Sequence, residues 1–362
     1  MDRLEAMPPL VRAILEDAIW APSGDNRQNW RFRVKSNSEF EIEIVDDSDW
    51  MVYDKEGNAT LIALGILCEY IKIAASKYGF TTQETFESLK VKQVSKCSIS
   101  LTKQSIRQDP LYEQLKIRTV QRKPMGTYPL TGEEKHLLEN ELAESFSIKW
   151  LESDSDKKQV ASLMFGNAHT RYAMKEGYEV HSKIIDFSKE GFVKSKTKLP
   201  AMSLGISLLW VKLTQLTLSS WPLFHFVEKY MAGTLVPRYL MEYQTAIQSS
   251  AHFILLKDEP VKCNQDYIEV GKNLIRFWLK ASQLGLGFQP EHTPVIFSEL
   301  LRNQVQFTQD QRALSNAVKM EAQFRQFVGD EAVNKAVYMG RLGRSDLPSS
   351  RSVRKSLAEL LI

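Results

Sequence analysis

The stretch from Ala21 to Val34 reads APSGDNRQNWRFRV, and it marks the passage from a helix to a strand through a short loop. Pro22 and Gly24 are residues that interrupt helices, because proline lacks an amide hydrogen and glycine loses much conformational freedom in a helix. From Trp30 onward apolar and polar residues alternate, which is typical of a strand with one buried face. The stretch therefore predicts a helix before it and a β-hairpin after it.

The flanking sequence extends this helix, loop and hairpin into a first unit. Residues 8–20 carry apolar side chains at helical spacing, and residues 40–45 (FEIEIV) alternate as the second strand of a hairpin would. We expect a long apolar helix over residues 59–77 and a further strand near residues 98–101. Together these elements form a first unit at residues 1–105.

A second unit, residues 106–362, repeats this order in outline. It begins with a basic segment, followed by Thr131-Gly132-Glu133-Glu134, which has the spacing of a helix capping box. Strands are predicted over residues 146–151, 252–256 and 336–342, and a long helix over residues 265–284. Helices that enclose a mixed or antiparallel sheet, an α+β arrangement, are the fold class that this order indicates.

The composition excludes several classes of protein. Of 362 residues, 47 are basic and 44 are acidic, so a formal charge of +3 indicates no nucleic-acid partner. The scattered cysteines Cys68, Cys97 and Cys263 predict reduced thiols and no structural metal site. The first residues, MDRLE, lack the apolar core of a signal peptide, so we expect a cytoplasmic protein.

Residues 204–226 are rich in Leu, Trp and Phe and raise the question of a membrane. A spanning helix needs about 20 mainly apolar residues. Lys212, Gln215 and Pro222 interrupt the apolar run. We therefore expect a lid or core helix and no membrane partner, with a true span and a peripheral membrane contact as the alternatives.

The loop after the first helix suits a flat ligand with a polar edge. Ser23, Gly24 and Asn26 offer short hydrogen-bonding groups and bare backbone on a tight turn. An ordinary helix end followed by a type I turn uses the same residue types, and it is the alternative interpretation of this loop.

Three further motifs follow in order along the chain. The first is Arg118-Thr119-Val120-Gln121-Arg122-Lys123, for which a solvated basic loop is the alternative. The second lies in residues 268–292, which contain Gly285-Leu286-Gly287 and then Gln289-Pro290-Glu291-His292. The third is the basic end of the chain, with Arg341-Leu342-Gly343 and the run RSVRKSL from residue 351.

The four motifs in this order resemble those of the nitroreductase superfamily of FMN-dependent oxidoreductases. The chain is most similar to a long subgroup with two halves, which includes mycobacterial dormancy proteins. The resemblance implies a nitroreductase-like fold in which the two halves form an internal pseudo-dimer within a monomer. Residues 1–105 would supply the loop that begins with Ala21-Pro22-Ser23, here called the APS loop, and residues 106–362 would supply the other motifs. Together the motifs would make one FMN site.

The resemblance also assigns roles to residues. Arg118 would bind the FMN phosphate, because guanidinium groups bind phosphate through paired hydrogen bonds. Arg122 would lie over the pyrimidine edge of the ring, where a positive charge stabilises the anionic reduced flavin. Val120 stands where the family has Ser or Thr, so Thr119 is expected to replace that hydroxyl. The predicted cofactor-binding residues are Pro22, Ser23, Gly24, Asn26, Arg118, Thr119, Arg122, Gln289, Pro290, Glu291, His292, Arg351, Arg354 and Lys355.

The activity that the resemblance implies is reduction of nitroaromatic, quinone or similar electron-poor compounds with NADH or NADPH by a ping-pong hydride mechanism. The flavin carries the hydride, so no catalytic residue beyond the cofactor and no metal are expected. One alternative is an FMN-sequestering protein, in which residues 204–230 close over the ring and exclude a nicotinamide. The other is a dedicated flavin oxidoreductase of a biosynthetic pathway.

Overall fold

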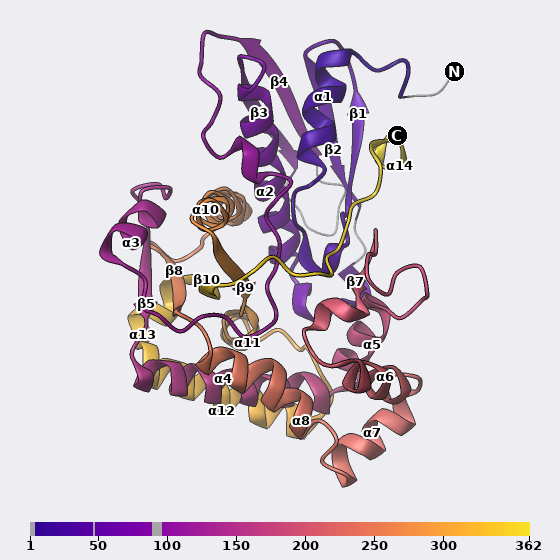
Figure 1. Ribbon diagram of the computed structural model, residues 1–362, viewed down its shortest axis with the longest axis vertical. Helices are drawn as coiled ribbons and strands as arrows, with labels where there is room; N and C mark the ends of the chain where they lie inside the picture. Colours follow the sequence, from indigo (N-terminus) through magenta and orange to yellow (C-terminus); the bar gives the residue numbers. More distant parts are fainter. Residues whose placement is uncertain (1–3, 46–47, 89–95) are drawn as a thin grey trace.

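The chain forms two four-stranded antiparallel sheets with helices packed around them, as the computed structural model shows for residues 4–45, 48–88 and 96–362 (Figure 1). This arrangement agrees with the predicted α+β class. The sequence predicted one sheet, either mixed or antiparallel, whereas the structure has two separate sheets. Each sheet draws its strands from one of the two predicted units.

The first sheet belongs to residues 1–105. Its elements are α1 (Pro9–Ala18), η1 (Gly24–Asn26), β1 (Trp30–Val34), β2 (Glu39–Ile44), η2 (Ser48–Trp50), η3 (Val52–Asp54), α2 (Asn58–Ser76), β3 (Phe80–Ser88) and β4 (Lys96–Lys103). The strand order is β1-β2-β4-β3, and Trp30 pairs with Ile44 in the predicted hairpin. Strand β3 was not predicted. It lies at the sheet edge. Its only apolar residues, Phe80 and Phe86, are too few and too far apart to give the alternating pattern of a strand.

The second sheet belongs to residues 106–362 and has the order β5-β8-β10-β9. Its strands are β5 (Phe146–Leu151), β8 (Ala251–Lys257), β9 (Leu286–Pro290) and β10 (Ala336–Arg344). A separate two-stranded parallel ribbon pairs β6 (Ile185–Asp186) with β7 (Leu199–Pro200). The helices and turns are η4 (Tyr112–Gln114), α3 (Gly132–Glu139), α4 (Asp154–Ala173), α5 (Lys175–Ile184), η5 (Ala201–Leu204), α6 (Leu208–Thr217), α7 (Trp221–Tyr230), α8 (Leu235–Arg238), η6 (Tyr239–Tyr243), α9 (Gln244–Ile247), α10 (Asn264–Gln283), α11 (Thr293–Arg302), α12 (Gln311–Val328), α13 (Asp330–Lys335) and α14 (Leu357–Leu360).

The capping box that the sequence predicted at Thr131 is confirmed at the start of α3. The Thr131 hydroxyl accepts a hydrogen bond of 3.1 Å from the Glu134 amide, and the Glu134 carboxylate accepts one of 2.8 Å from the Thr131 amide. This reciprocal pair satisfies two amides at the start of α3, as a capping box does.

Helices α2 and α10 cross at the centre of the molecule and join the two units. A β-carbon at Gly65 of α2 would overlap the carbonyl oxygen of Ile268, and one at Gly271 of α10 would overlap that of Ile62. Two glycines therefore permit the backbones to approach closely at the crossing. Among the described residues, α2 is the one helix long and apolar enough to span a membrane, and 89% of its most apolar window is buried, as in a core helix.

The C-terminal tail returns from the second unit to the first. Figure 1 shows it running from β10 across the molecule to α14, which lies beside β1. Leu361 forms an isolated parallel bridge with Phe32, and the Ile362 amide donates a hydrogen bond of 3.0 Å to the Phe32 carbonyl. The tail thereby brings its basic residues alongside the APS loop.

Candidate functional site

One cavity of about 460 Å³ is lined by side chains from both units. This volume falls within the range of small-molecule sites, roughly 300 to 1,000 Å³. Every residue that the sequence assigned to a cofactor lines the cavity except Lys355, whose backbone amide donates to Gln28 instead. The predicted residues that the fold brings together are Pro22, Ser23, Gly24, Asn26, Arg118, Thr119, Arg122, Gln289, Pro290, Glu291, His292, Arg351 and Arg354.

Three arginines make one end of the cavity basic. Arg118 precedes α3, while Arg351 and Arg354 follow β10. Within residues 4–45, 48–88 and 96–362, no carboxylate forms an ion pair with any of the three. Burial, and next the charge of Arg118, lower the pKa of Arg351, and the same two causes lower the pKa of Arg354 to about 9. This end therefore holds positive charge without a counter-ion from the protein.

Arg118 is held in place by both central helices. Its Nε donates a hydrogen bond of 3.0 Å to the hydroxyl of Tyr70 in α2, and its guanidinium lies 4.4 Å from the ring centroid of Trp278 in α10. The side chain is 3% exposed. A hydrogen bond on one side and a cation–π contact on the other leave few rotamers open to it.

The APS loop has a backbone that an ordinary type I turn does not require. Asp25, Asn26 and Gln28 all have positive φ, at 52°, 62° and 50°. Residues with side chains rarely adopt this left-handed region, and non-glycine examples gather at functional sites. The loop is held by long-range bonds, among them one of 2.7 Å from the Gln28 side chain to the carbonyl of Lys196. Ser23 closes the loop by accepting from the Gln28 amide at 2.9 Å.

The side chain of Asn26 is committed to protein atoms. Its amide nitrogen lies 3.1 Å from the Val353 carbonyl and 3.4 Å from that of Ser195, and its oxygen accepts from Arg354. Asn26 lines the cavity, and its side chain also positions the tail beside the APS loop. Its buried polar groups are satisfied before any ligand binds.

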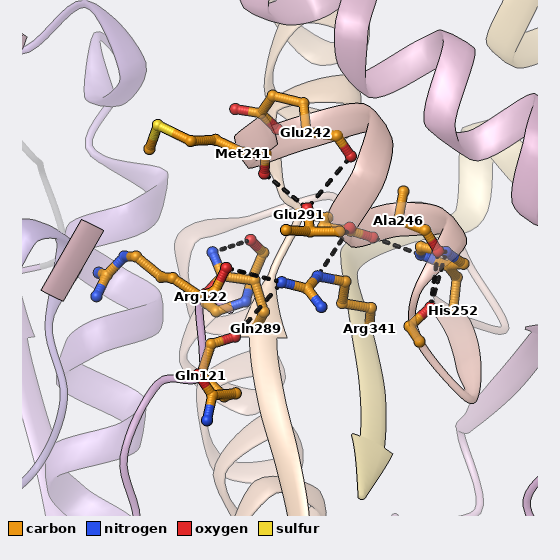
Figure 2. Close-up of polar contacts among 12 residues, drawn as sticks. Gln121, Arg122, Met241, Glu242, Ala246, His252, Gln289, Glu291 and Arg341 are labelled. Carbon is orange, nitrogen blue, oxygen red and sulfur yellow. Dashed lines mark hydrogen bonds and ion pairs between the residues drawn. The ribbon is translucent and has the colours of Figure 1, made fainter. Parts of the chain in front are cut away.

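A buried network fixes the backbone of the Arg118–Lys123 loop (Figure 2). Arg341 of β10 donates from one terminal nitrogen to the carbonyl oxygens of Gln121, Arg122 and Lys123, at 3.3 to 3.5 Å. Its Nε lies 3.4 Å from Glu291 Oε1, and Glu291 Oε2 lies 2.6 Å from His252 Nδ1. The buried charge of Arg341 thus orients the loop that carries Arg122.

Residues 289–292 are only partly the loop that the sequence predicted. Gln289 and Pro290 belong to edge strand β9, where Gln289 pairs with Arg341. Glu291 lines the cavity, yet its carboxylate is bound within the network of Figure 2. His292 stacks on Tyr338 with ring centroids 4.5 Å apart, and burial lowers the pKa of His292 to about 4.

Arg122 and Asp25 both line the cavity and lie close enough for their charges to interact. Burial lowers the pKa of Arg122, while the nearby Asp25 carboxylate raises it. Burial raises the pKa of Asp25, against the charges of Arg27, Arg122 and Arg171. The terminal nitrogen of Arg122 lies 3.4 Å from the Ser203 carbonyl oxygen, a long contact that holds the side chain only loosely.

The sequence missed the cavity end opposite the three arginines. It is lined by Tyr53 of η3, Arg171 and Tyr172 of α4, His181 of α5 and Glu242 of η6. These residues come from four separate elements and form no motif, so only a signal of long-range contact could have found them.

Helices α6 and α7 complete the wall of the cavity. Thr214 and Leu218 line it from the first helix and its end, and Phe224 and Val227 from the second. The segment was predicted as a lid or core helix, and it forms two helices whose outer face is apolar and exposed, as at Leu209, which is 66% exposed. Figure 1 places both helices at one corner of the molecule, away from the first sheet.

Within the described part of the chain, no group of three or more His, Cys, Asp or Glu side chains is placed to hold a metal ion. No protein-family model matches this chain, and no curated protein matches it.

Proposed function

We propose that this protein binds FMN and acts as a nitroreductase-like oxidoreductase. The observation that carries the proposal is the cluster of the buried Arg118 with the partly buried Arg351 and Arg354, which lacks a carboxylate partner among the described residues. Buried charge of one sign is costly unless it is compensated. A phosphate monoester supplies two negative charges and accepts paired guanidinium bonds, so it suits this end of the cavity.

The rest of the cavity suits a flat ring with polar edges. Gln289 Oε1, His292 Nδ1 and Thr293 Oγ1 are buried and have no hydrogen-bond partner in the protein, and all three residues line the cavity. Buried polar atoms of this kind require partners, which the edge of an isoalloxazine ring offers. Arg122 adds a positive charge that favours electrons added to a ring beside it. Bound FMN would itself supply the hydride chemistry.

We further propose that the two units are the halves of an internal pseudo-dimer. Each has a four-stranded antiparallel sheet and one long central helix, α2 of 19 residues or α10 of 20 residues. The two helices cross at the centre. Motifs from both halves line the same cavity, which supports a single FMN per chain.

The activity that we propose is reduction of electron-poor compounds such as nitroaromatics or quinones by NADH or NADPH. The wall formed by α6 and α7 supports one alternative, FMN sequestration behind closed helices. Anaerobic addition of NADPH or NADH separates the two, because a reductase would lose the yellow absorption of its flavin and a sequestering protein would keep it. A role in a biosynthetic pathway would use the same site.

Titration of the flavin-free protein with FMN and with riboflavin tests the proposed cofactor. Riboflavin lacks the phosphate and keeps the ring, so we expect FMN to bind and riboflavin to bind far more weakly. Binding of neither compound, or equal binding of both, would contradict the assignment of the arginine cluster to phosphate.

A further inference from the structure

Three polar atoms without partners gather at the cavity end opposite the arginine cluster. They are the Tyr53 hydroxyl, Arg171 Nε and His181 Nδ1, all buried and outside hydrogen-bonding geometry with other protein atoms, although the Gly177 backbone lies near enough to the His181 ring to act on its pKa. All three residues line the cavity. Native proteins leave few buried polar atoms unsatisfied, so three in one place indicate a ligand group that completes them.

Aromatic rings surround these atoms. The centroid of His181 lies 5.3 Å from that of Tyr172 and 6.2 Å from that of Tyr53. Phe224 of α7 packs against Tyr172 at 6.2 Å with its ring nearly edge-on. A ligand here meets ring faces and edges on several sides, which favours an aromatic ring as its body.

The charge at this end is balanced by the protein. Arg171 forms an ion pair with Glu242 through its terminal nitrogen, and both side chains are mostly buried. Burial, and next the charge of Arg171, lower the pKa of His181 to about 3, so its ring is neutral at pH 7. Burial raises the pKa of Tyr53, which keeps its hydroxyl protonated. The subsite thus offers hydrogen bonds without surplus positive charge.

We propose that this end of the cavity is a subsite for an uncharged aromatic compound that carries a carbonyl, nitro or hydroxyl oxygen. The Tyr53 hydroxyl and the Arg171 Nε donate to that oxygen, and the neutral His181 ring nitrogen donates or accepts according to its tautomer. A carboxylate is disfavoured, because Glu242 already neutralises Arg171 and the buried Asp25 lies within the field of the same arginine. Burying another anion there would leave it without a counter-charge.

This inference rests on the proposed function for its meaning, since the oxygenated aromatic would be the electron acceptor. Asp25 lies between the subsite and the part of the cavity near Arg122, because the charges of both Arg122 and Arg171 act to lower the pKa of its carboxyl group. The subsite therefore adjoins the part of the cavity that we assign to the ring of FMN. It restricts the proposed acceptors to neutral ones.

Calorimetric titration with three probes tests the subsite without turnover. Acetophenone, benzoate and ethylbenzene share a ring and a similar size, but carry a neutral acceptor, a negative charge and no polar atom, respectively. We expect acetophenone to bind more tightly than each of the other two by about threefold to tenfold, the effect of one or more net hydrogen bonds. Equal affinities, tighter binding of benzoate, or binding of none of the probes would overturn the subsite.

The titrations are made on the protein with and without FMN. Failure of FMN to bind, with the preference for acetophenone intact, would count against the proposed function and leave the subsite supported. Normal FMN binding with no preference among the probes would count against the subsite alone.

Tyr53→Phe removes one hydroxyl and keeps the ring. We expect the Kd of acetophenone to rise about threefold to tenfold and that of ethylbenzene to stay within about twofold. Tyr128→Phe is the matched control, because Tyr128 is 79% exposed and lies outside the cavity. An equal loss for both probes would show that Tyr53 only shapes the wall. The comparison on the unaltered protein stays decisive if the variant does not fold.

Discussion

The guanidinium of Arg354 donates a hydrogen bond of 2.9 Å to the side-chain oxygen of Asn26, 328 positions earlier in the chain. The same guanidinium lies 3.1 Å from the Ala21 carbonyl and 3.3 Å from that of Trp20. The tail of the second unit is thereby tied to the end of α1 and to the APS loop. This pairing assembles the basic end of the cavity from both units.

Asn26→Ala should therefore destabilise the fold as well as weaken FMN binding. The change leaves the Val353 and Ser195 carbonyl groups without the Asn26 donor and removes one of the acceptors of Arg354, which costs about 1 to 3 kcal/mol of unfolding free energy. Urea denaturation of the flavin-free protein measures this loss, with the exposed Asn140→Ala as the control. An unchanged denaturation midpoint would show that the tail does not depend on Asn26.

Arg118→Ala should weaken FMN binding by about 1.5 to 3 kcal/mol, the usual contribution of a hydrogen bond to a charged group. Riboflavin binding should change much less, because the contact removed is to phosphate. Fluorescence titration gives both constants. Arg33→Ala serves as the control, since the Arg33 side chain is 44% exposed and lies outside the cavity. Similar losses for FMN and riboflavin would point to collapse of the cavity.

Arg122→Gln should make the bound flavin harder to reduce. Removing the positive charge should shift the two-electron potential by about 30 to 60 mV to more negative values, equivalent to about 1.4 to 2.8 kcal/mol. A redox titration of the variant beside the unaltered protein measures the shift. No shift in a variant that still binds FMN would place Arg122 away from the ring.

Glu291→Gln should destabilise the protein by about 3 to 5 kcal/mol, because Arg341 would remain buried without its counter-charge. The side chains of Arg341 and Glu291 are 1% and 4% exposed, so water cannot compensate. Glu144→Gln, at an exposed position, is the control. Comparable denaturation midpoints for the two variants would mean that the network contributes little to the stability of the fold.

Acid should destabilise the flavin-free protein through His292. Burial lowers the folded pKa of His292 to about 4, below its ordinary value of 6.5, so the unfolded chain binds the proton more readily. The contribution of His292 to the unfolding free energy is complete above about pH 6.5. It falls by about 1.4 kcal/mol per pH unit as the pH is lowered toward 4. His292→Phe keeps a ring against Tyr338 and should reduce the pH slope of the unfolding free energy. The exposed His136→Phe should leave that slope as it is.

Sequence reasoning missed strands β3 and β9 of the four-stranded sheets and the two-residue strands β6 and β7. Both β3 and β9 lie at the edge of a sheet, and β9 contains a glycine and ends at Pro290. Edge position alone is not the cause, because the edge strands β1 and β5 were predicted. Strand β3 has only two apolar residues, and the glycine and proline of β9 are residue types that favour a loop in a sequence-based interpretation. Central strands such as β8, with a continuous apolar run, were predicted within about one residue at each end.

Local signals in the sequence predicted the helix before Pro22, the hairpin that begins at Trp30, the capping box at Thr131 and the order of the four motifs. Periodicity and capping depend on residues a few positions apart, so they can be read along the chain. Folding alone brings Asn26 to Arg354 and Glu291 to Arg341, and it places Tyr53, Arg171 and His181 at one end of the cavity. Those contacts join distant segments, and they form because α2 and α10 pack closely and the tail returns to β1.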